Sequence, residues 1–512
     1  MRISNILTVK IKTKLELLKW WKSSESFAIR IFIVALILRL IPVIIMKNMG
    51  IGLDDMFQYD MLARSISAGN GYRWYAKADL PVVLPYLKLD LSSINYDPRG
   101  VLTSFRPPLY PTFLAIIYLI FGIGAKRFFI VRIIQAILAA WMAPLTYYIG
   151  KRLFPNQKKV GQISAWVITL YPMLVIYPLS IATENLFFIL ILGSFLSLLK
   201  ARESIEAPYL QQGIAFIKKD RWFLLSGILL GLACLTRSVA QLYMLFCVGW
   251  VWFILKEKRA GMILLLAAVV TVLPWIIRNS LLYGQVSGIE SAIGYDLYLG
   301  YHPLGTGTFQ FPQSLDLMTV MNDAAREKIG IRSALEFIRA DPVRVFYLFF
   351  RRVGYFFGLE NRAIIYFYSN NYFGNIPPGI LVGLLGLFCL PFILVSISSV
   401  IGSAVTSGSK ETILMALFLA GYITPHLLII AEDRFHLAII PFMAILSGNL
   451  WAGGWNTIRR TWVASRKRKI LIMMASIAVI LLLVNWGMEI GRNSDKLALL
   501  LSPLGNVTYF SY

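Results

Sequence analysis

Long apolar runs, separated by short polar and basic segments, dominate the chain. Each clear run is close to the roughly 20 residues that a helix needs to cross about 30 Å of hydrocarbon. The clearest are Phe27 to Met46, Trp222 to Leu255, Met262 to Ile277, Ile380 to Val400 and Ile470 to Trp486. The pattern predicts an all-α polytopic membrane protein with about eleven spans, or about thirteen if two shorter apolar segments also cross.

Composition supports a membrane protein and excludes other classes. Of the 512 residues, 58% are hydrophobic and only 15% charged, unlike a soluble domain. The formal net charge of +24 falls in short blocks between apolar runs, which favours topology signals and anionic lipid over nucleic acid. The three cysteines lie in apolar stretches without metal-ligand or paired spacing, so neither a disulfide framework nor a zinc site is expected.

Basic loops predict the orientation, because short cytoplasmic loops are enriched in lysine and arginine. The loops expected to be cytoplasmic are 1–26, 151–159, 200–221, 256–259 and 459–469. We therefore expect one transmembrane domain at 27–488, with outer loops at 47–126 and 278–378. A basic cytoplasmic N-terminus (1–26) precedes it and an external tail (489–512) follows.

Two apolar segments lie between stretches that are both expected outside, namely Pro108 to Gly124 and Val343 to Phe357. Neither can cross the membrane if the loop assignments hold. Two prolines open the first segment, and Arg351 and Arg352 interrupt the second. Both are predicted to be helices that lie at the outer surface or re-enter.

Two adjacent carboxylates, Asp54 and Asp55, follow the first predicted span. Neighbouring acids raise each other's pKa and can supply a general base or a cation ligand. The alternative is a helix N-cap followed by a first-turn acid, because 56–67 has a helical pattern. The spacing alone leaves both interpretations open.

Other charged residues map to the predicted outer ends of spans. They are Arg106, Arg237, Arg278, Arg434 and Glu184. A guanidinium group matches phosphate oxygens, and an intramembrane acid indicates function by default. The alternatives are snorkelling of arginines to head groups, turn chemistry at Arg106 and a first-turn acid at Glu184. Arg39, midway along the first span, is expected to pair inside the bundle.

A series of short motifs resembles the GT-C superfamily of membrane glycosyltransferases, in the branch similar to bacterial protein O-mannosyltransferases and lipid A aminoarabinose transferase. In order, the motifs are Asp55-Met-Phe-Gln-Tyr59, Gly69-Asn-Gly71-Tyr72, Arg106-Pro-Pro-Leu-Tyr-Pro111, Tyr171-Pro172 with Thr183-Glu184, Leu235-Thr-Arg237, Pro274-Trp-Ile-Ile-Arg278-Asn279, Gly294-Tyr295 with Gly300, and Glu432-Asp-Arg434-Phe with Pro441. Their order covers most of the first 445 residues. The resemblance implies a GT-C-like bundle with juxtamembrane helices in the first outer loop.

The resemblance also implies roles for residues. Asp55 is the expected catalytic acid; many relatives have Asp-Glu where this chain has Asp55-Met56, so Asp54 is the candidate to replace the second acid. The expected donor-phosphate ligands are Arg106, Arg237, Arg278 and Arg434, and the expected substrate contacts are Tyr59, Tyr110, Glu184 and His436. No cofactor or metal ligand set is required, although Asp54 and Asp55 could hold a divalent metal.

The function so implied is inverting transfer of a sugar from a polyprenyl-phosphate monosaccharide to an acceptor hydroxyl on the non-cytoplasmic face of the membrane. The expected partners are that lipid-linked donor, a glycan, glycolipid or protein acceptor, and membrane lipid, without nucleic acid. Two other classes compete with this prediction. One is a lipid or glycolipid transporter, and the other is a ligase or polymerase of diphosphate-linked glycans.

Overall fold

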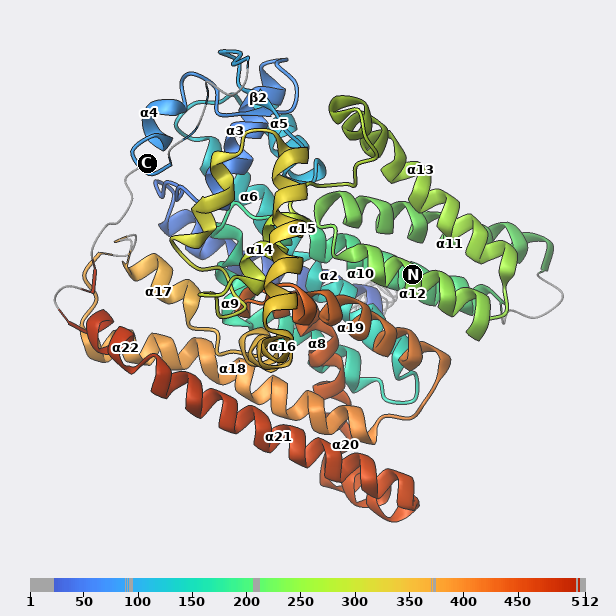
Figure 1. The fold of residues 1–512 in the computed structure, drawn as a ribbon. Coiled ribbons are helices and arrows are strands. Elements are labelled where there is room, and N and C mark those ends of the chain that lie inside the picture. Colours follow the sequence, from blue (N-terminus) through green and yellow to red (C-terminus); the bar gives the residue numbers. More distant parts are fainter. Residues whose placement is uncertain are drawn as a thin grey trace, which may run out of the picture.

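The fold was described from a computed structural model, which covers residues 23–87, 89, 91, 95–205, 212–369, 371, 374–502 and 505–506. Most of the predicted basic N-terminus therefore lies outside the described residues. The described chain is almost entirely helical, as predicted (Figure 1). Its only strands, β1 (Arg73–Trp74) and β2 (Val101–Leu102), form one short antiparallel pair.

Eight described helical segments are long and apolar enough to cross a membrane. They are α2 (Ser24–Ile45), α6 (Arg127–Ala140) with α7 (Met142–Leu153), α10 (Glu184–Ile205), α13 (Lys258–Tyr283), α18 (Pro378–Val405), α19 (Lys410–Leu428), η6 (Asp433–Ile439) with α20 (Ile440–Ala464), and α21 (Arg466–Arg492). The protein is thus an integral, multi-pass membrane protein.

One further apolar helix pair is bent, and it is a ninth span if its two parts cross together. Helix α8 (Lys159–Leu170) and the segment formed by α9 (Pro172–Ile176) and η2 (Tyr177–Leu179) meet at 58°. The bend occurs at Tyr171, which has extended backbone angles because it precedes a proline that excludes the helical conformation. The break carries the chain toward Glu184.

Two further apolar segments are helical, namely α11 (Gln212–Thr236) and α12 (Ala240–Gly249) with η4 (Trp250–Ile254). The long apolar run from Trp222 to Leu255 is therefore two helices rather than one, and the chain turns between them at Arg237. The described residues contain eight candidate spans, or nine if the bent pair is one span, against the predicted eleven.

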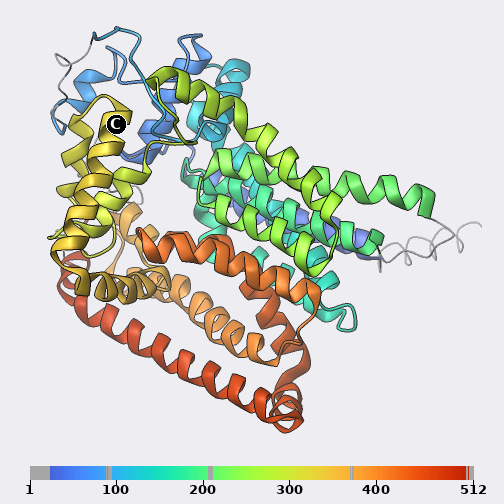
Figure 2. The same cartoon turned by 45° about the vertical axis from the view of Figure 1, so that its right-hand side comes forward.

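The bundle has two helical groups. Helices α10, α11 and α13 pack together on one side, and α18, α20 and α21 pack on the other (Figure 2). Contacts of α20 with α8 join the two groups. Helix α21 continues to Arg492 and is followed by α22 (Ser494–Leu500), so the predicted boundary at residue 488 lies inside a helix.

The loop predicted to be the first outer loop contains three short helices, α3 (Asp55–Ser67), α4 (Leu80–Val83) and α5 (Leu109–Phe121). The second contains α14 (Ile293–Tyr301), η5 (Gln313–Thr319), α15 (Asp323–Ala340), α16 (Pro342–Phe356) and α17 (Arg362–Ser369). With 13 and 15 residues, α5 and α16 are about 20 and 23 Å long, too short to cross the hydrocarbon. Both agree with the prediction that these segments do not span.

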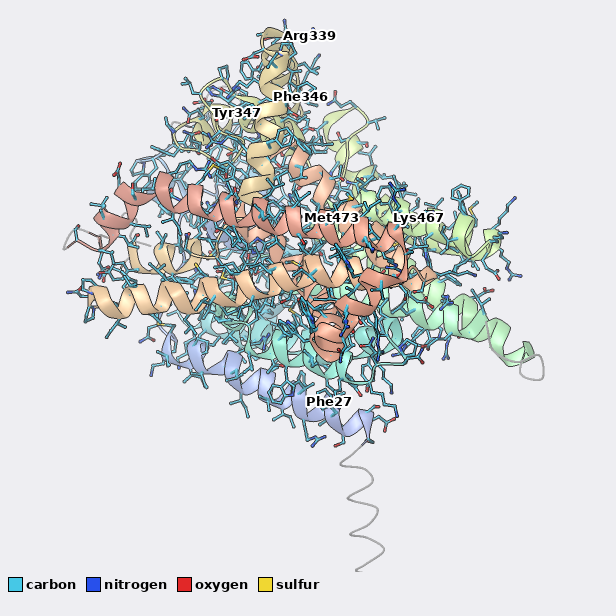
Figure 3. All side chains as sticks on the ribbon, turned by 90° about the horizontal axis from the view of Figure 1, so that it is seen from below. Phe27, Arg339, Phe346, Tyr347, Lys467 and Met473 are labelled. Atoms are coloured by element: carbon cyan, nitrogen blue, oxygen red, sulfur yellow. The ribbon has the colours of Figure 1, made fainter. Side chains whose placement is uncertain are left out.

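Helix α16 has an apolar face that the rest of the described chain leaves uncovered. Phe346 and Phe350 are 72% and 70% exposed, and Tyr347 is exposed beside them. Figure 3 shows Phe346 and Tyr347 on the helix surface, far from Phe27 at the start of α2. Such a face suits a helix that lies at a membrane interface.

A buried carboxylate ties the two outer loops together. Asp323, at the start of α15, accepts hydrogen bonds from the Thr103 hydroxyl and the Ser104 N–H, both at 2.6 Å, and pairs with Arg326. Tyr283, at the end of α13, donates to the same carboxylate at 3.0 Å. The loops therefore form one rigid cap over an end of the bundle.

Close packing of α14 on α15 depends on glycine. A Cβ atom at Gly294 would lie 2.2 Å from the carbonyl oxygen of Glu327, and one at Gly330 would lie 2.3 Å from the carbonyl oxygen of Gly294. The two backbones thus approach more closely than any side chain allows. This explains the small residue in the Gly294-Tyr295 motif.

We expect Gly294→Ala to lower the free energy of unfolding by about 1–3 kcal/mol, because the added methyl group must push α15 away. The thermal unfolding midpoint of the detergent-purified protein would report the loss. Gly487→Ala is the matched control, since a Cβ atom there meets no atom within 4 Å. Equal midpoints for the two variants would contradict the tight-packing explanation.

Candidate functional site

Asp54 and Asp55 lie where the first span ends and α3 begins. Asp54 is the N-cap of α3, and its side chain accepts the Met56 N–H at 2.9 Å. Asp55 is the first residue of the helix. The interpretation as an N-cap followed by a first-turn acid is therefore confirmed for Asp54 and Asp55, and the Asp55 carboxylate is directed to other partners.

Two arginines from distant parts of the chain hold the Asp55 carboxylate. Arg106, just before α5, pairs with Oδ1 of Asp55, and Arg434, in η6, pairs with Oδ2 at 3.1 Å. Arg106 is oriented by a 2.9 Å hydrogen bond from its Nε to Gln58. Each carboxylate oxygen of Asp55 thus has its own guanidinium partner.

A buried glutamate continues this charge network. Glu432 has a fully buried side chain and accepts from Arg434 at 2.8 Å and from Arg362 at 2.5 Å. Arg362 begins α17 in the second outer loop, and half of its side chain is exposed. No motif in the sequence singled out Arg362, because its partner is 70 residues away.

Arg237 and Glu184 form a second ion pair. Arg237, where α11 ends, lies 2.6 Å from Glu184, the first residue of α10, and also donates to Thr183 at 3.2 Å. The guanidinium groups of Arg237 and Arg434 both lie near the Phe435 ring, 5.2 and 5.6 Å from its centre. We call Asp55, Arg106, Arg434, Arg237 and Glu184 the charged cluster.

The surroundings of the two acids shift their pKa values in opposite directions. Burial alone would raise the pKa of Asp55, but Arg106 and Arg434 outweigh it and hold that pKa well below its usual range. Burial and the adjacent Asp55 charge raise the pKa of Asp54. The Asp55 side chain is 32% accessible, and Asp54 is exposed. Asp55 is therefore ionised at neutral pH and reachable.

Two carboxylates of the second outer loop face the same charges. Asp296 on α14 interacts electrostatically with Glu290, Arg106 and Asp55. Burial raises the pKa of Asp296 well above its ordinary value, and Glu290 adds to that shift. Burial also raises the pKa of Glu290, which accepts a hydrogen bond from Ser238. Among the described residues, no three His, Cys, Asp or Glu side chains are grouped so that they could hold a metal ion.

Arg132 on α6 supports the cluster from behind. Its guanidinium group is fully buried and donates to the carbonyl oxygens of Met49, Gly50 and Leu179, the last two at 2.6 and 2.7 Å. These carbonyls belong to the loop before Asp54 and to the end of the bent span before Glu184. Arg132 was missed by sequence reasoning, although an arginine inside an apolar helix is itself a signal.

The predicted aromatic residues lie below the cluster. Tyr59 packs edge-on against Tyr110 with ring centres 5.1 Å apart, and the Arg106 guanidinium lies 5.5 Å from the Tyr59 ring. The Tyr110 hydroxyl donates to Gln135, whose amide donates to the Pro178 and Ser180 carbonyls. Tyr110 is completely buried, so it supports Tyr59 rather than lining open space.

Three residues that the sequence analysis singled out make their contacts outside the charged cluster. Arg278 donates to the Thr103 carbonyl at 2.7 Å and stacks over Trp275, so it fixes α13 to the loop junction. His436 is fully buried, stacks on Phe392 and bonds to Glu360. Arg39 donates to the carbonyls of Ala35 and Ile168, which confirms pairing inside the bundle.

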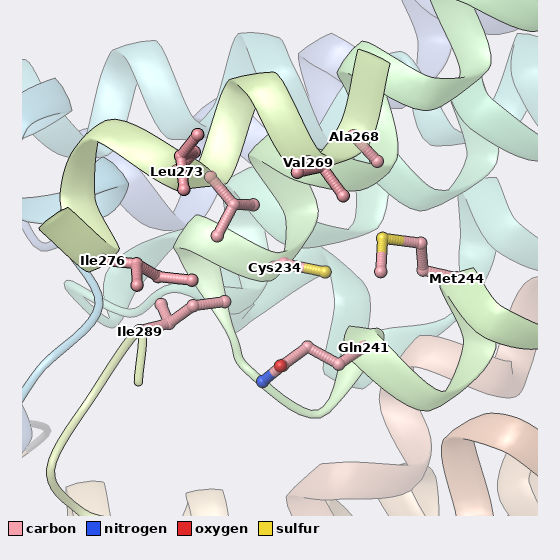
Figure 4. A pocket seen from close by; sticks show the side chains of 9 residues that line it. Cys234, Gln241, Met244, Ala268, Val269, Leu273, Ile276 and Ile289 are labelled. Carbon is pink, nitrogen blue, oxygen red and sulfur yellow. The ribbon is translucent and has the colours of Figure 1, made fainter. Parts of the chain in front are cut away.

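An apolar cavity of about 130 Å³ lies between α11, α12 and α13 (Figure 4). Its walls include Cys234, Met244, Val272 and Ile276, and Gln241 is one of the few polar side chains that line it. Ile289, which also lines it, is the neighbour of Glu290. The cavity therefore begins close to the acidic residues of the second outer loop.

Sequence comparison finds no relatives: neither the models of known protein families nor the curated proteins include a match to this chain. Solved structures do match. The archaeal oligosaccharyltransferase AglB from Archaeoglobus fulgidus, in complex with an inhibitory peptide and a dolichol-phosphate, aligns with a TM-score of 0.50 and 13% identity. The alignment covers 96% of this chain and 62% of AglB, so this chain spans less than two thirds of that protein.

Two other solved structures align with lower TM-scores. A second structure of the A. fulgidus oligosaccharyltransferase, tethered to an acceptor peptide, gives a TM-score of 0.49 at 14% identity over 96% of this chain and 61% of that one. ArnT from Cupriavidus metallidurans, bound to undecaprenyl phosphate, gives 0.40 at 11% identity over 86% and 81%. The chain therefore shares the fold of the membrane-embedded oligosaccharyltransferase AglB, as the sequence motifs led us to expect.

Proposed function

We propose that this protein transfers a sugar from a polyprenyl-phosphate donor to an acceptor hydroxyl, with inversion, on the non-cytoplasmic face of the membrane. One observation carries the proposal: an accessible carboxylate, Asp55, lies between Arg106 and Arg434 at the start of α3. Such a site can supply a base and bind an anionic leaving group together. The lipid carriers bound in the AglB and ArnT structures are consistent with a lipid-phosphate donor.

The donor phosphate and Asp55 would compete for the same guanidinium groups. Both Arg106 and Arg434 pair with Asp55. A phosphate that takes over these groups leaves Asp55 with fewer positive neighbours, so its pKa rises and it becomes a better base. Binding of the donor thereby activates the residue that accepts the acceptor proton.

The proposed reaction is a single displacement. The acceptor hydroxyl attacks the anomeric carbon and loses its proton to the Asp55 carboxylate, while the bond between that carbon and the phosphate oxygen breaks. Arg106, Arg434 and Arg237 stabilise the negative charge that develops on the released polyprenyl phosphate. Glu432 holds Arg434 in place, since its own charge is balanced by Arg362.

The apolar cavity beside α11, α12 and α13 suits the first isoprenoid units of the donor. Its lining is almost entirely apolar, and the helices around it carry Arg237 and Ser238 at the turn between α11 and α12. A phosphate at the charged cluster would thus have an apolar surface next to it for its lipid chain.

A divalent metal is the remaining question about cofactors. Asp54 offers carboxylate oxygens, whereas the oxygens of Asp55 are engaged by two arginines. We propose that these cations take the place of a metal at the phosphate. Assays with added magnesium or manganese, and with chelator, test this directly.

The first test is release of free polyprenyl phosphate from a panel of polyprenyl-phosphate sugars, with envelope extract as the source of acceptors. We expect Asp55→Asn to lower turnover by about 10² to 10⁴, since a general base contributes that much. Asp97→Asn is the control, because Asp97 is an arginine-paired carboxylate of the same loop that lies away from the cluster. Wild-type turnover in Asp55→Asn would contradict the proposed base, and no release from any donor would favour a transporter or a diphosphate-glycan ligase.

Donor affinity should distinguish the arginines. Arg106→Lys removes a planar two-donor contact, so we expect the donor KM to rise by about 10-fold or more. Arg278→Lys should change the donor KM far less, because Arg278 contacts a backbone carbonyl and Trp275 instead. Steady-state kinetics on both variants measures the donor KM. Equal increases in donor KM would indicate that Arg278 also binds the donor phosphate.

The pH dependence should differ between kcat/KM and kcat, which report the free enzyme and the donor complex respectively. In the free enzyme the depressed pKa of Asp55 keeps the base ionised below the usual titration range of aspartate. In the donor complex the phosphate binds the arginines in place of Asp55, so the pKa of Asp55 is higher. We therefore expect the acidic fall in kcat at higher pH than the acidic fall in kcat/KM. Coincident profiles would show that the arginines stay on Asp55 during the reaction.

A further inference from the structure

A buried histidine and a buried glutamate meet behind the charged cluster. The Nε2 atom of His436 lies 2.8 Å from Oε1 of Glu360, and both side chains are almost inaccessible. The other ring nitrogen, Nδ1, lies 2.7 Å from the backbone carbonyl oxygen of Phe356. Tyr171 donates its hydroxyl proton to Oε1 of Glu360 at 2.7 Å.

These contacts determine how many protons the pair carries. A carbonyl oxygen can only accept, so Nδ1 of His436 must carry the proton that Phe356 receives. In a neutral imidazole, Nε2 is then an acceptor, and it faces a carboxyl oxygen at 2.8 Å. Two acceptors at that distance repel each other, so one further proton must lie between His436 and Glu360, on either the ring or the carboxyl group.

The pair joins three segments that surround the cluster. Tyr171 marks the break between α8 and α9, Glu360 precedes α17, and His436 lies in η6. Arg362 and Arg434 are each two residues from a member of the pair, and both bind Glu432. A displacement of His436 from Glu360 would therefore move the arginine that contacts Asp55.

We propose that Glu360 and His436 share one proton and act as a positioning pair, which fixes η6 so that Arg434 stays aligned with Asp55. His436 is thus a positioning residue rather than a substrate contact. The functional half of this inference rests on the proposed role of Arg434. The proton itself does not depend on any reaction.

Other titratable groups surround the pair. Asp433 on η6, Glu489 on α21 and Cys389 on α18 face it, together with Tyr171. The carboxylates of Asp433 and Glu489 favour a positive charge at the pair, so they help to retain the shared proton as pH rises. Above the pH at which the pair finally loses this proton, Nε2 and Oε1 must separate.

Nitrogen-15 NMR of the full-length protein, labelled at its three histidines, tests the proton directly. A His302→Gln sample, which removes the most accessible histidine, assigns one signal, and His436→Gln assigns another. We expect Nδ1 of His436 to be protonated and Nε2 to take part in a hydrogen bond through the shared proton. A His436 ring that carries its single proton on Nε2, or an Nε2 signal without a hydrogen bond, would overturn the shared proton.

Two variants of Glu360 test the positioning role by donor kinetics. In Glu360→Gln an amide nitrogen in place of Oε1 can donate one proton to Nε2 and the other to the Tyr171 hydroxyl, so we expect the donor KM to stay within about twofold of wild type. In Glu360→Leu both partners are lost, and we expect the donor KM to rise by about tenfold. Equal donor KM values for folded Glu360→Leu and wild type would overturn the positioning role.

The alkaline side of the pH profile separates positioning from simple structural support. The wild type should lose kcat/KM at the pH where the pair loses its proton, whereas Glu360→Gln has no such proton and should keep kcat/KM there. The same alkaline loss in both proteins would overturn the link to activity. If Asp55→Asn were fully active while the NMR result held, the proposed reaction would fail and the shared proton would stand.

Discussion

The arrangement of side chains around the charged cluster depends on the compensation of buried charge. Removing an ion from water costs several kcal/mol, so each buried carboxylate in this region needs cationic partners. Asp55 has Arg106 and Arg434, Glu432 has Arg434 and Arg362, and Glu184 has Arg237. Since each pair joins different elements, the requirement for compensation also fixes the relative positions of α3, α5, α10, α11 and η6.

The same requirement explains why the outer loops are rigid. Asp323 draws together residues 103 and 104 of the first loop and Tyr283 of α13, and Arg132 gathers carbonyls from two further segments. Loops that carry a site are most useful when a fixed scaffold positions them. Here the scaffold includes buried polar groups in the loops themselves, so the position of Asp55 does not depend on the apolar bundle alone.

This arrangement connects structure to the proposed chemistry. A carboxylate held between two arginines is stable and ionised, but it is also a poor base until one of its partners is withdrawn. An anionic donor is the natural competitor for those arginines. In the proposed reaction, exchange of these ion pairs for contacts with the donor would prepare Asp55 for proton transfer.

Much of the molecule follows from the sequence. Hydrophobic run lengths determined the all-helical membrane fold, because a span needs a fixed length of apolar chain, and the prolines at 107, 108 and 172 determined where helices start or break. Local order of charges also identified Asp55, Arg106, Arg237, Arg434 and Glu184, since charged residues at the ends of apolar runs are costly to keep there without a purpose.

Which of those residues meet was decided only by the tertiary structure. Arg278 and Arg434 occupy similar positions at span ends in the sequence, yet one fixes a loop and the other contacts Asp55 from 379 residues away. Arg362 and Glu360 have no distinctive local pattern at all. Their roles come from long-range pairing in three dimensions, and a single sequence carries no spacing rule for contacts of that kind.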